Sequence, residues 1–226
     1  MNTDNTQQIK VWDGFVRFFH WALVSLIALL YFSGEEGWMA IHFIAGFSVL
    51  TLVSTRLIWG LIGSDTAKLS HLFHGPKAVW QSIKYGKQTI GHNPAGSYMV
   101  LLFFALVLAQ AVSGLMTTDD ILTDGPLVSV VDSAWVELAS SLHRLIFDGL
   151  LIAIGLHIVA IVIYRLRGKP LVKAMITGKM NTTTAVTSEQ EAINMKSGWV
   201  AFVMWLVLEA IILSTWGLES LKTLLG

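Results

Sequence analysis

The sequence predicts an all-α membrane protein in which a bundle of four transmembrane helices is followed by a fifth, C-terminal transmembrane helix. Hydrophobic residues make up 54% of the 226 residues and charged residues only 13%, about half the ~25% that soluble domains carry. The mean hydropathy is +0.64. A chain of this length cannot bury so much apolar surface in a globule, and its uncharged runs approach the roughly 20 residues that cross a bilayer.

Five apolar segments are long enough to span, once tilt and interfacial residues are allowed. The predicted spans are about Phe15–Phe32, Trp38–Gly60, Tyr98–Met116, Ser141–Tyr164 and Trp199–Trp216. The turn sequence Ser33-Gly34-Glu35-Glu36-Gly37 ends the first span, and Arg165, Arg167 and Pro170 stop the fourth.

Polar segments connect these spans. Met1–Lys10 is expected to be a short polar tail, and a connection of nearly forty residues after the second span contains one candidate surface helix, His74–Tyr85. A Thr-rich linker begins near Lys179. The predicted organisation is therefore a four-helix bundle at residues 1–179, a polar linker at 180–198, and an additional helix at 199–226.

The basic residues predict the orientation. Only Arg144 and Lys222 fall on one side if the five spans alternate, whereas thirteen fall on the other. The thirteen are Lys10, Arg17, Arg56, Lys68, Lys77, Lys84, Lys87, Arg165, Arg167, Lys169, Lys173, Lys179 and Lys196. Because cytoplasmic loops carry the excess of Lys and Arg, we expect a cytoplasmic N-terminus, a periplasmic C-terminus, and an outward-facing acidic loop at Asp119–Glu137.

Composition excludes several functional classes. Fifteen Lys and Arg balance fifteen Asp and Glu, so no basic excess points to nucleic acid. The absence of cysteine excludes disulfides, iron–sulfur clusters, thiolate zinc sites and thioether attachment of haem. No HExxH or ExxH pair and no phosphate-binding glycine loop occurs, so catalysis by side chains has little support.

Four of the seven histidines lie within the apolar segments: His20, His42, His143 and His157. An ionisable side chain inside a span is costly and is by default a functional candidate, although any one of them alone could equally be a hydrogen-bond donor between helices. His143 and His157 are 14 residues apart, so on one helix they point the same way within ~40° and are separated by about 21 Å.

The topology places these histidines at two depths. His20 follows Arg17 near the cytoplasmic end of the first span and matches His157, whereas His42 lies near the outer end of the second span and matches His143. Two matched pairs are what two bis-histidine haems stacked across a bilayer require, since neutral imidazole is a good haem-iron ligand. A zinc or di-iron site would instead need its ligands clustered at one level.

Three motifs carry a resemblance to a known family. They are Val11–Trp21 (VWDGFVRFFHW), Arg56–Gly60 (RLIWG) and Gly91–Gly96 (GHNPAG), followed by the histidine pair in the fourth span. In this order the chain resembles the bacterial cytochrome b561 family, which is grouped with the b-type cytochrome subunits of nickel–iron hydrogenases and the membrane subunit of formate dehydrogenase. The resemblance covers about residues 11–179.

The resemblance implies a four-helix bundle in the bacterial inner membrane that holds two non-covalent haems b. By resemblance, His20 with His157 would ligate the iron of the cytoplasmic-side haem, and His42 with His143 that of the outer haem. Arg17 and Arg144 flank these histidines and are either propionate partners or interfacial anchors. Gly46, four residues after His42, would admit a porphyrin edge or a close helix contact.

The predicted function is electron transfer in a respiratory chain between the quinone or quinol pool and a redox protein such as a c-type cytochrome, which the acidic outer loop would attract. The alternatives are the cytochrome subunit of a nickel–iron hydrogenase and a non-redox membrane anchor or transporter. We expect quinone chemistry near the inner haem, where His71, His74 and His92 could exchange protons, although each of the three singly is more simply a solvated side chain.

The orientation is testable with fusions. A reporter joined after Lys179 is expected to behave as cytoplasmic and one joined at Gly226 as periplasmic, because thirteen of the fifteen basic residues lie on one side. Paired phosphatase and fluorescent-protein fusions measure this, and a cytoplasmic signal at Gly226 would show that Trp199–Trp216 does not span.

Overall fold

In the computed structural model, the described residues are 7–85, 91–119, 121, 123–182 and 193–225. Four features of the sequence lie outside them: the first six residues of the tail, Lys87, residues 183–192 of the linker, and Gly226. The prediction of an all-α membrane protein is confirmed, since four helices are long and apolar enough to cross a membrane.

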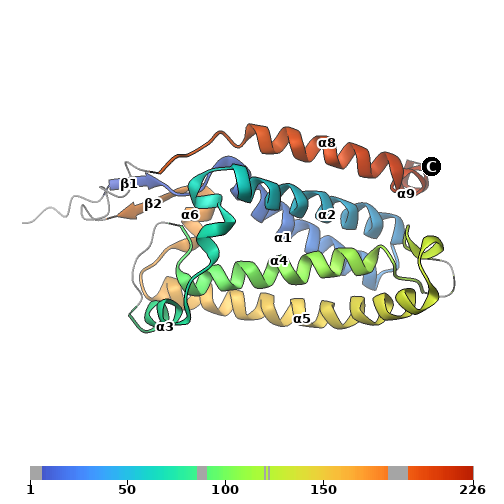
Figure 1. Cartoon of the computed structure of the whole chain (residues 1–226), viewed down its shortest axis with the longest axis horizontal. Coiled ribbons are helices and arrows are strands. Elements are labelled where there is room, and N and C mark those ends of the chain that lie inside the picture. Colours follow the sequence, from blue (N-terminus) through green and yellow to red (C-terminus); the bar gives the residue numbers. More distant parts are fainter. Residues whose placement is uncertain (1–6, 86–90, 120, 122, 183–192, 226) are drawn as a thin grey trace, which may run out of the picture. The chain divides into compact units, whose positions relative to one another are not determined.

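The helices follow the predicted order (Figure 1). The longer ones are α1 (Gly14–Glu35), α2 (Met39–Ile62), α4 (Pro94–Gly114), α5 (Ser133–Leu166) and α8 (Trp199–Thr215). The shorter ones are α3 (Pro76–Tyr85), α6 (Leu171–Thr177) and α9 (Leu218–Leu225). The candidate surface helix expected near His74–Tyr85 is thus present as α3.

Two predicted boundaries are wrong, one at the start of α5 and one at the end of α1. The fourth span was expected from Ser141, but α5 begins at Ser133, which is eight residues or about 12 Å earlier. His143 therefore lies inside the helix rather than near its end. The turn predicted after the first span is also shorter than expected, because α1 continues through Glu35. Of the predicted turn, only Gly37, with a φ of +68°, needs the left-handed backbone that glycine adopts readily.

The fifth predicted span is shorter than the other four. α8 contains 17 residues, and α9 follows it after a bend of 82°. The pair passes as a membrane span only when the two helices are taken together as one broken segment. The described residues therefore contain four candidate spans, or five if this bent pair crosses.

The chain forms two compact units, and each long helix contributes one part to each unit. Unit 1 comprises residues 1–18, 56–101 and 156–202, and unit 2 comprises residues 19–55, 102–155 and 203–226. Of the thirteen basic residues assigned to one side, all twelve that are described belong to unit 1, whereas Arg144 and Lys222 belong to unit 2. The division into residues 1–179, 180–198 and 199–226 stays a prediction.

In unit 1, a buried polar cluster joins the first two motifs of the sequence. Asp13 accepts the backbone N–H of Val16 at 2.8 Å, which caps α1, and the indole N–H of Trp59 at 3.0 Å. Arg56 interacts electrostatically with Asp13 and donates to the carbonyl of Ala67 at 3.0 Å. Asp13 and Arg56 are only 1% and 2% exposed, so each needs such partners. These motif residues therefore have a structural role.

A two-stranded sheet forms where the sequence predicted only a polar tail and a linker. β1 (Gln7–Lys10) pairs antiparallel with β2 (Lys179–Thr182) in unit 1. The connection before β2 turns at Gly178, whose φ is +75° and whose carbonyl accepts the N–H of Val11 at 2.8 Å. A Cβ at Gly178 would lie 2.9 Å from the carbonyl oxygen of Trp12. The pairing partner of each strand is more than 160 residues away, so local pattern could not indicate it.

The segment before α8 is attached to the end of α2 in unit 1. Asp65 accepts the N–H of Asn194 at 2.8 Å, and Lys196 donates to the carbonyl of Ile62 at 2.5 Å. The hydrogen bond from Lys68, followed by the one from Asn194, lowers the pKa of the Asp65 carboxyl. These contacts fix the point at which the chain enters α8.

In unit 2, Glu209 ties α8 to α2. Its carboxylate accepts hydrogen bonds from Ser48, at 2.5 Å, and from Thr51. An unpaired carboxylate inside a span is costly, so these two hydroxyls determine which face of α8 meets α2. Glu209 therefore joins α8 to α2 by hydrogen bonds within unit 2.

Replacing Glu209 with Leu is expected to lower the free energy of unfolding by about 1 to 2 kcal/mol, because two hydrogen bonds within the span are lost. Unfolding in a graded denaturing-detergent titration measures this. The matched control is Glu219→Gln, which breaks an exposed pair with Lys222 and should change little. Equal losses in the two variants would contradict the role of Glu209.

Candidate haem-ligand histidines

His42 lies in the first turn of α2 and is held by the last turns of α1, within unit 2. Its Nδ1 is 3.1 Å from the carbonyl oxygen of Leu30 and 3.2 Å from Oγ of Ser33. Ser33 is fully buried. A Cβ at Gly34 would lie 3.4 Å from Cε1 of the imidazole, so the ring packs directly on the helix backbone.

His143 on α5 is held in the same way by the last turns of α4, also within unit 2. Its Nδ1 is 3.1 Å from the carbonyl oxygen of Gln110 and 3.1 Å from Oγ of Ser113. A Cβ at Gly114 would lie 3.0 Å from Cε1 of the imidazole. The same three groups therefore hold both rings: a helix carbonyl, a serine three residues later, and a glycine after the serine.

This arrangement determines the chemistry of both rings. A carbonyl oxygen can only accept, so Nδ1 carries the proton in each hydrogen bond, and Nε2 of the neutral ring keeps its lone pair. Within the described residues, no hydrogen bond is made by either Nε2 atom. Binding Nδ1–H to a backbone carbonyl is how proteins orient an imidazole whose Nε2 ligates a metal. The two imidazoles also interact electrostatically.

The residues that hold these rings were not predicted from the sequence. Ser33-Gly34 was interpreted only as a turn, and Ser113-Gly114 was not singled out. The signal was nevertheless present, because a Ser-Gly pair stands at the end of both the first and the third apolar helices. A serine and a glycine repeated at that position in two spans indicate close approach of a side chain from a neighbouring helix.

His20 and His157 fall in different units and are described separately. His20 is the seventh residue of α1 and belongs to unit 2, where its ring meets that of Trp21 edge-on at 5.0 Å. His157 lies on α5 and belongs to unit 1. Their pairing stays a prediction from the sequence.

The histidines of the long connection differ in their surroundings. His71 is exposed, as expected. His74 is hydrogen-bonded through Nε2 to Oγ of Ser97 at 3.2 Å, and the ring of His92 lies 4.6 Å from that of Trp12. The expectation that all three are simply solvated is therefore wrong for His74 and His92, which help to build unit 1.

Arg17 has a buried donor group for which the described residues supply no acceptor. Its Nη1 donates to the carbonyl of Ile176 at 2.8 Å, but Nε is buried and makes no hydrogen bond with the described residues. A buried guanidinium N–H suits a carboxylate such as a haem propionate. Arg144, in contrast, is exposed. At Gly46, a Cβ would meet only Leu30, at 4.0 Å, so the structure does not require glycine there.

The donor set fits haem. Two imidazoles with lone pairs at Nε2 and hydrogen-bonded Nδ1 are suitable axial ligands, and a buried guanidinium N–H is a suitable propionate donor. A family model described as prokaryotic cytochrome b561 matches residues 11–178, which include all four candidate histidines. No curated protein and no solved structure matches the chain.

The two glycines are expected to differ in how well they tolerate alanine. In Gly114→Ala the new Cβ would lie 3.0 Å from the His143 ring, so the ring must move and its bond to Gln110 weakens, whereas the 3.4 Å gap at Gly34 tolerates Ala. Ring NMR of ¹⁵N-histidine-labelled protein should show a displaced His143 Nδ1–H resonance in Gly114→Ala and an unmoved His42 resonance in Gly34→Ala. Equal displacement in both variants would contradict this.

Proposed function

Because the chain belongs to the prokaryotic cytochrome b561 family, and is thus a membrane b-type cytochrome of electron transfer, we propose that it is a diheme cytochrome linking the quinone or quinol pool to a redox protein. Family membership supports this function over a non-redox anchor or transporter. A c-type cytochrome is the partner we expect.

The observation that carries the proposal is the matched environment of His42 and His143. Both donate Nδ1–H to a helix carbonyl and both leave Nε2 for a ligand. In the proposal, one haem iron is held between these two Nε2 atoms. Two axial histidines leave no position for oxygen or substrate, so the site favours electron transfer over bond-making chemistry.

The second haem of the proposal rests on the sequence. His20 and His157 match in depth along their spans, and the family resemblance assigns them to one iron. Of the chain's other groups, the Nε of Arg17 supports this assignment, because it is a buried donor three residues before His20. We propose that Arg17 binds a propionate of this haem and that Arg144 is an interfacial anchor.

When bound, haem b supplies a one-electron couple, and the chain's residues set its conditions. The hydrogen bonds to Leu30 and Gln110 fix the orientation of the imidazoles. They also increase the basicity of Nε2, which favours the ferric state of a ligated iron. The apolar side chains of the spans keep water away from the ligating atoms.

For the protein partner, we propose the loop between α4 and α5. Asp119 accepts the N–H groups of Ile121 and Thr123, and Asp124 accepts the hydroxyl of Thr118 at 2.6 Å, so these two carboxylates shape the loop. Asp132 in this loop and Glu137, which lies in the first turns of α5 rather than in the loop as predicted, are exposed. These are the carboxylates that a basic carrier would meet. Complementary charge of this kind mainly raises the encounter rate.

The pairing of ligands is tested by deleting them one at a time. His42→Ala and His143→Ala should each remove the same haem component in a redox titration, and His157→Ala should remove the other, because an iron that loses one axial imidazole binds weakly or changes spin state. His74→Ala, whose histidine contacts Ser97, is the control and should keep both. If His42→Ala and His143→Ala remove different components, the assignment fails.

A further inference from the structure

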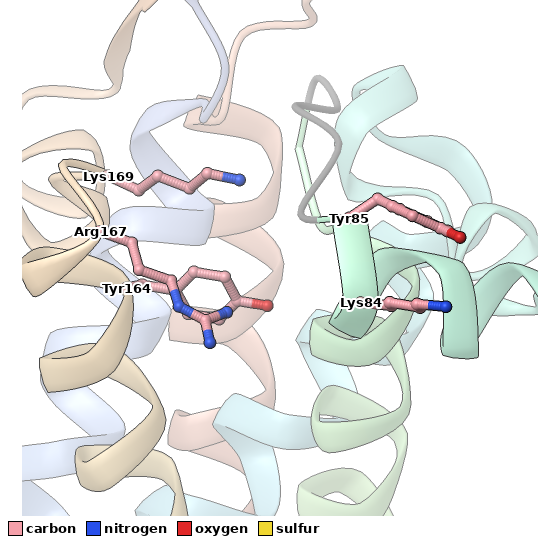
Figure 2. A pocket seen from close by; sticks show the side chains of 5 residues that line it. All are labelled: Lys84, Tyr85, Tyr164, Arg167 and Lys169. Carbon is pink, nitrogen blue, oxygen red and sulfur yellow. The ribbon is translucent and has the colours of Figure 1, made fainter.

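A cavity of about 260 Å³ opens in unit 1 between the last turn of α3 and the end of α5. Figure 2 shows the five side chains that line it: Lys84, Tyr85, Tyr164, Arg167 and Lys169. The two tyrosines are held in place by neighbours. Tyr164 OH accepts the side-chain N–H of Asn93 at 2.9 Å, and the Lys84 ammonium lies 5.2 Å from the centre of the Tyr85 ring.

The lining of the cavity carries charge of one sign. Three of the five residues are cations, and no carboxylate of the described residues lines the cavity. Lys84 and Arg167 form no ion pair within the described part of the chain. The remaining polar groups, two phenol hydroxyls, can donate to an oxyanion. A cavity with this lining selects an anion with several oxygen acceptors, and phosphate has that chemistry.

The elements around the cavity indicate where the phosphate comes from. Arg167 follows directly after α5, which is a candidate span, and therefore stands at the depth of lipid headgroups. On α3, Trp80 and Ile83 are 67% and 54% exposed, beside Lys77 and Lys84 on the adjoining face. An exposed apolar face next to a row of lysines is typical of a helix lying in the membrane interface. The binding of dissolved phosphate would not explain why this apolar surface is exposed.

We propose that this cavity binds the phosphate headgroup of an anionic phospholipid, with α3 lying in the same leaflet. Arg167 and Lys169, which extend from the end of α5 toward α3 in Figure 2, neutralise the phosphate, and the hydroxyl of Tyr164 donates to its oxygens. Lys84 and Tyr85 line the cavity from α3 but extend away from these three side chains. Trp80 and Ile83 contact the acyl chains. A basic pocket at the cytoplasmic end of transmembrane helices is the kind of site that binds such headgroups. This site is separate from the histidines and does not depend on their role.

Lipid binding to the purified full-length protein tests the proposal. Native mass spectrometry would count molecules of phosphatidylglycerol and of phosphatidylcholine retained in mild detergent by wild type, by Arg167→Gln/Lys169→Gln, and by the control Lys10→Gln/Lys173→Gln. The control removes two exposed cations from β1 and α6 that do not line the cavity. Circular dichroism and gel filtration would establish that each variant is folded, and a further arm adds excess inorganic phosphate.

Wild type should retain phosphatidylglycerol in preference to phosphatidylcholine. The cavity variant should lose about 10- to 30-fold in affinity for it, since each basic residue near an anionic surface contributes about fivefold, and the control about twofold or less. If the cavity variant is not folded, Arg167→Gln alone should lose about fivefold. Equal losses in cavity variant and control would overturn the proposal, as would equal retention of the two lipids. Displacement of phosphatidylglycerol by inorganic phosphate would overturn the lipid assignment in favour of free phosphate.

Discussion

A hydrogen bond from Nδ1 of a histidine to a helix carbonyl determines what the other ring nitrogen can do. At His42 and His143 this bond fixes the tautomer and the direction of Nε2. At His143 it also depends on Gly114, where a side chain would displace the ring from the neighbouring helix. The ligand role proposed for both histidines follows from this contact. Without it, each would be an ordinary polar group inside a span.

Burial imposes the second constraint, because polar groups away from water must find partners inside the protein. In unit 1, Asp13 accepts hydrogen bonds from a backbone N–H in the first turn of α1 and from the indole of Trp59. In unit 2, Glu209 accepts hydrogen bonds from two hydroxyls of α2. In both places, a costly acid positions one helix against another. These acids therefore have a structural role, whereas the imidazoles of His42 and His143 each keep one ring nitrogen available for a ligand.

The sequence was sufficient to predict the five longer helices, though not the short α6 and α9, because apolar runs of about 20 residues are visible without tertiary information. It also placed His42 and His143 at one level, and the structure brings both into one compact unit. The carbonyls of Leu30 and Gln110 could not be predicted, since a backbone oxygen has no sequence signature. The strand pairing of Gln7–Lys10 with Lys179–Thr182 was missed because it joins segments far apart in the chain. The early start of α5 was missed because its first turns carry an acidic residue, which is more typical of a loop.

The most direct test of the account is the low-temperature electron paramagnetic resonance spectrum of the oxidised, purified protein, integrated per chain. Four histidines acting as axial ligands in two pairs predict two low-spin ferric haems per chain, because each iron has two imidazole ligands and no open position. A high-spin ferric signal at full haem occupancy, or one haem per chain, would contradict the assignment of these four residues.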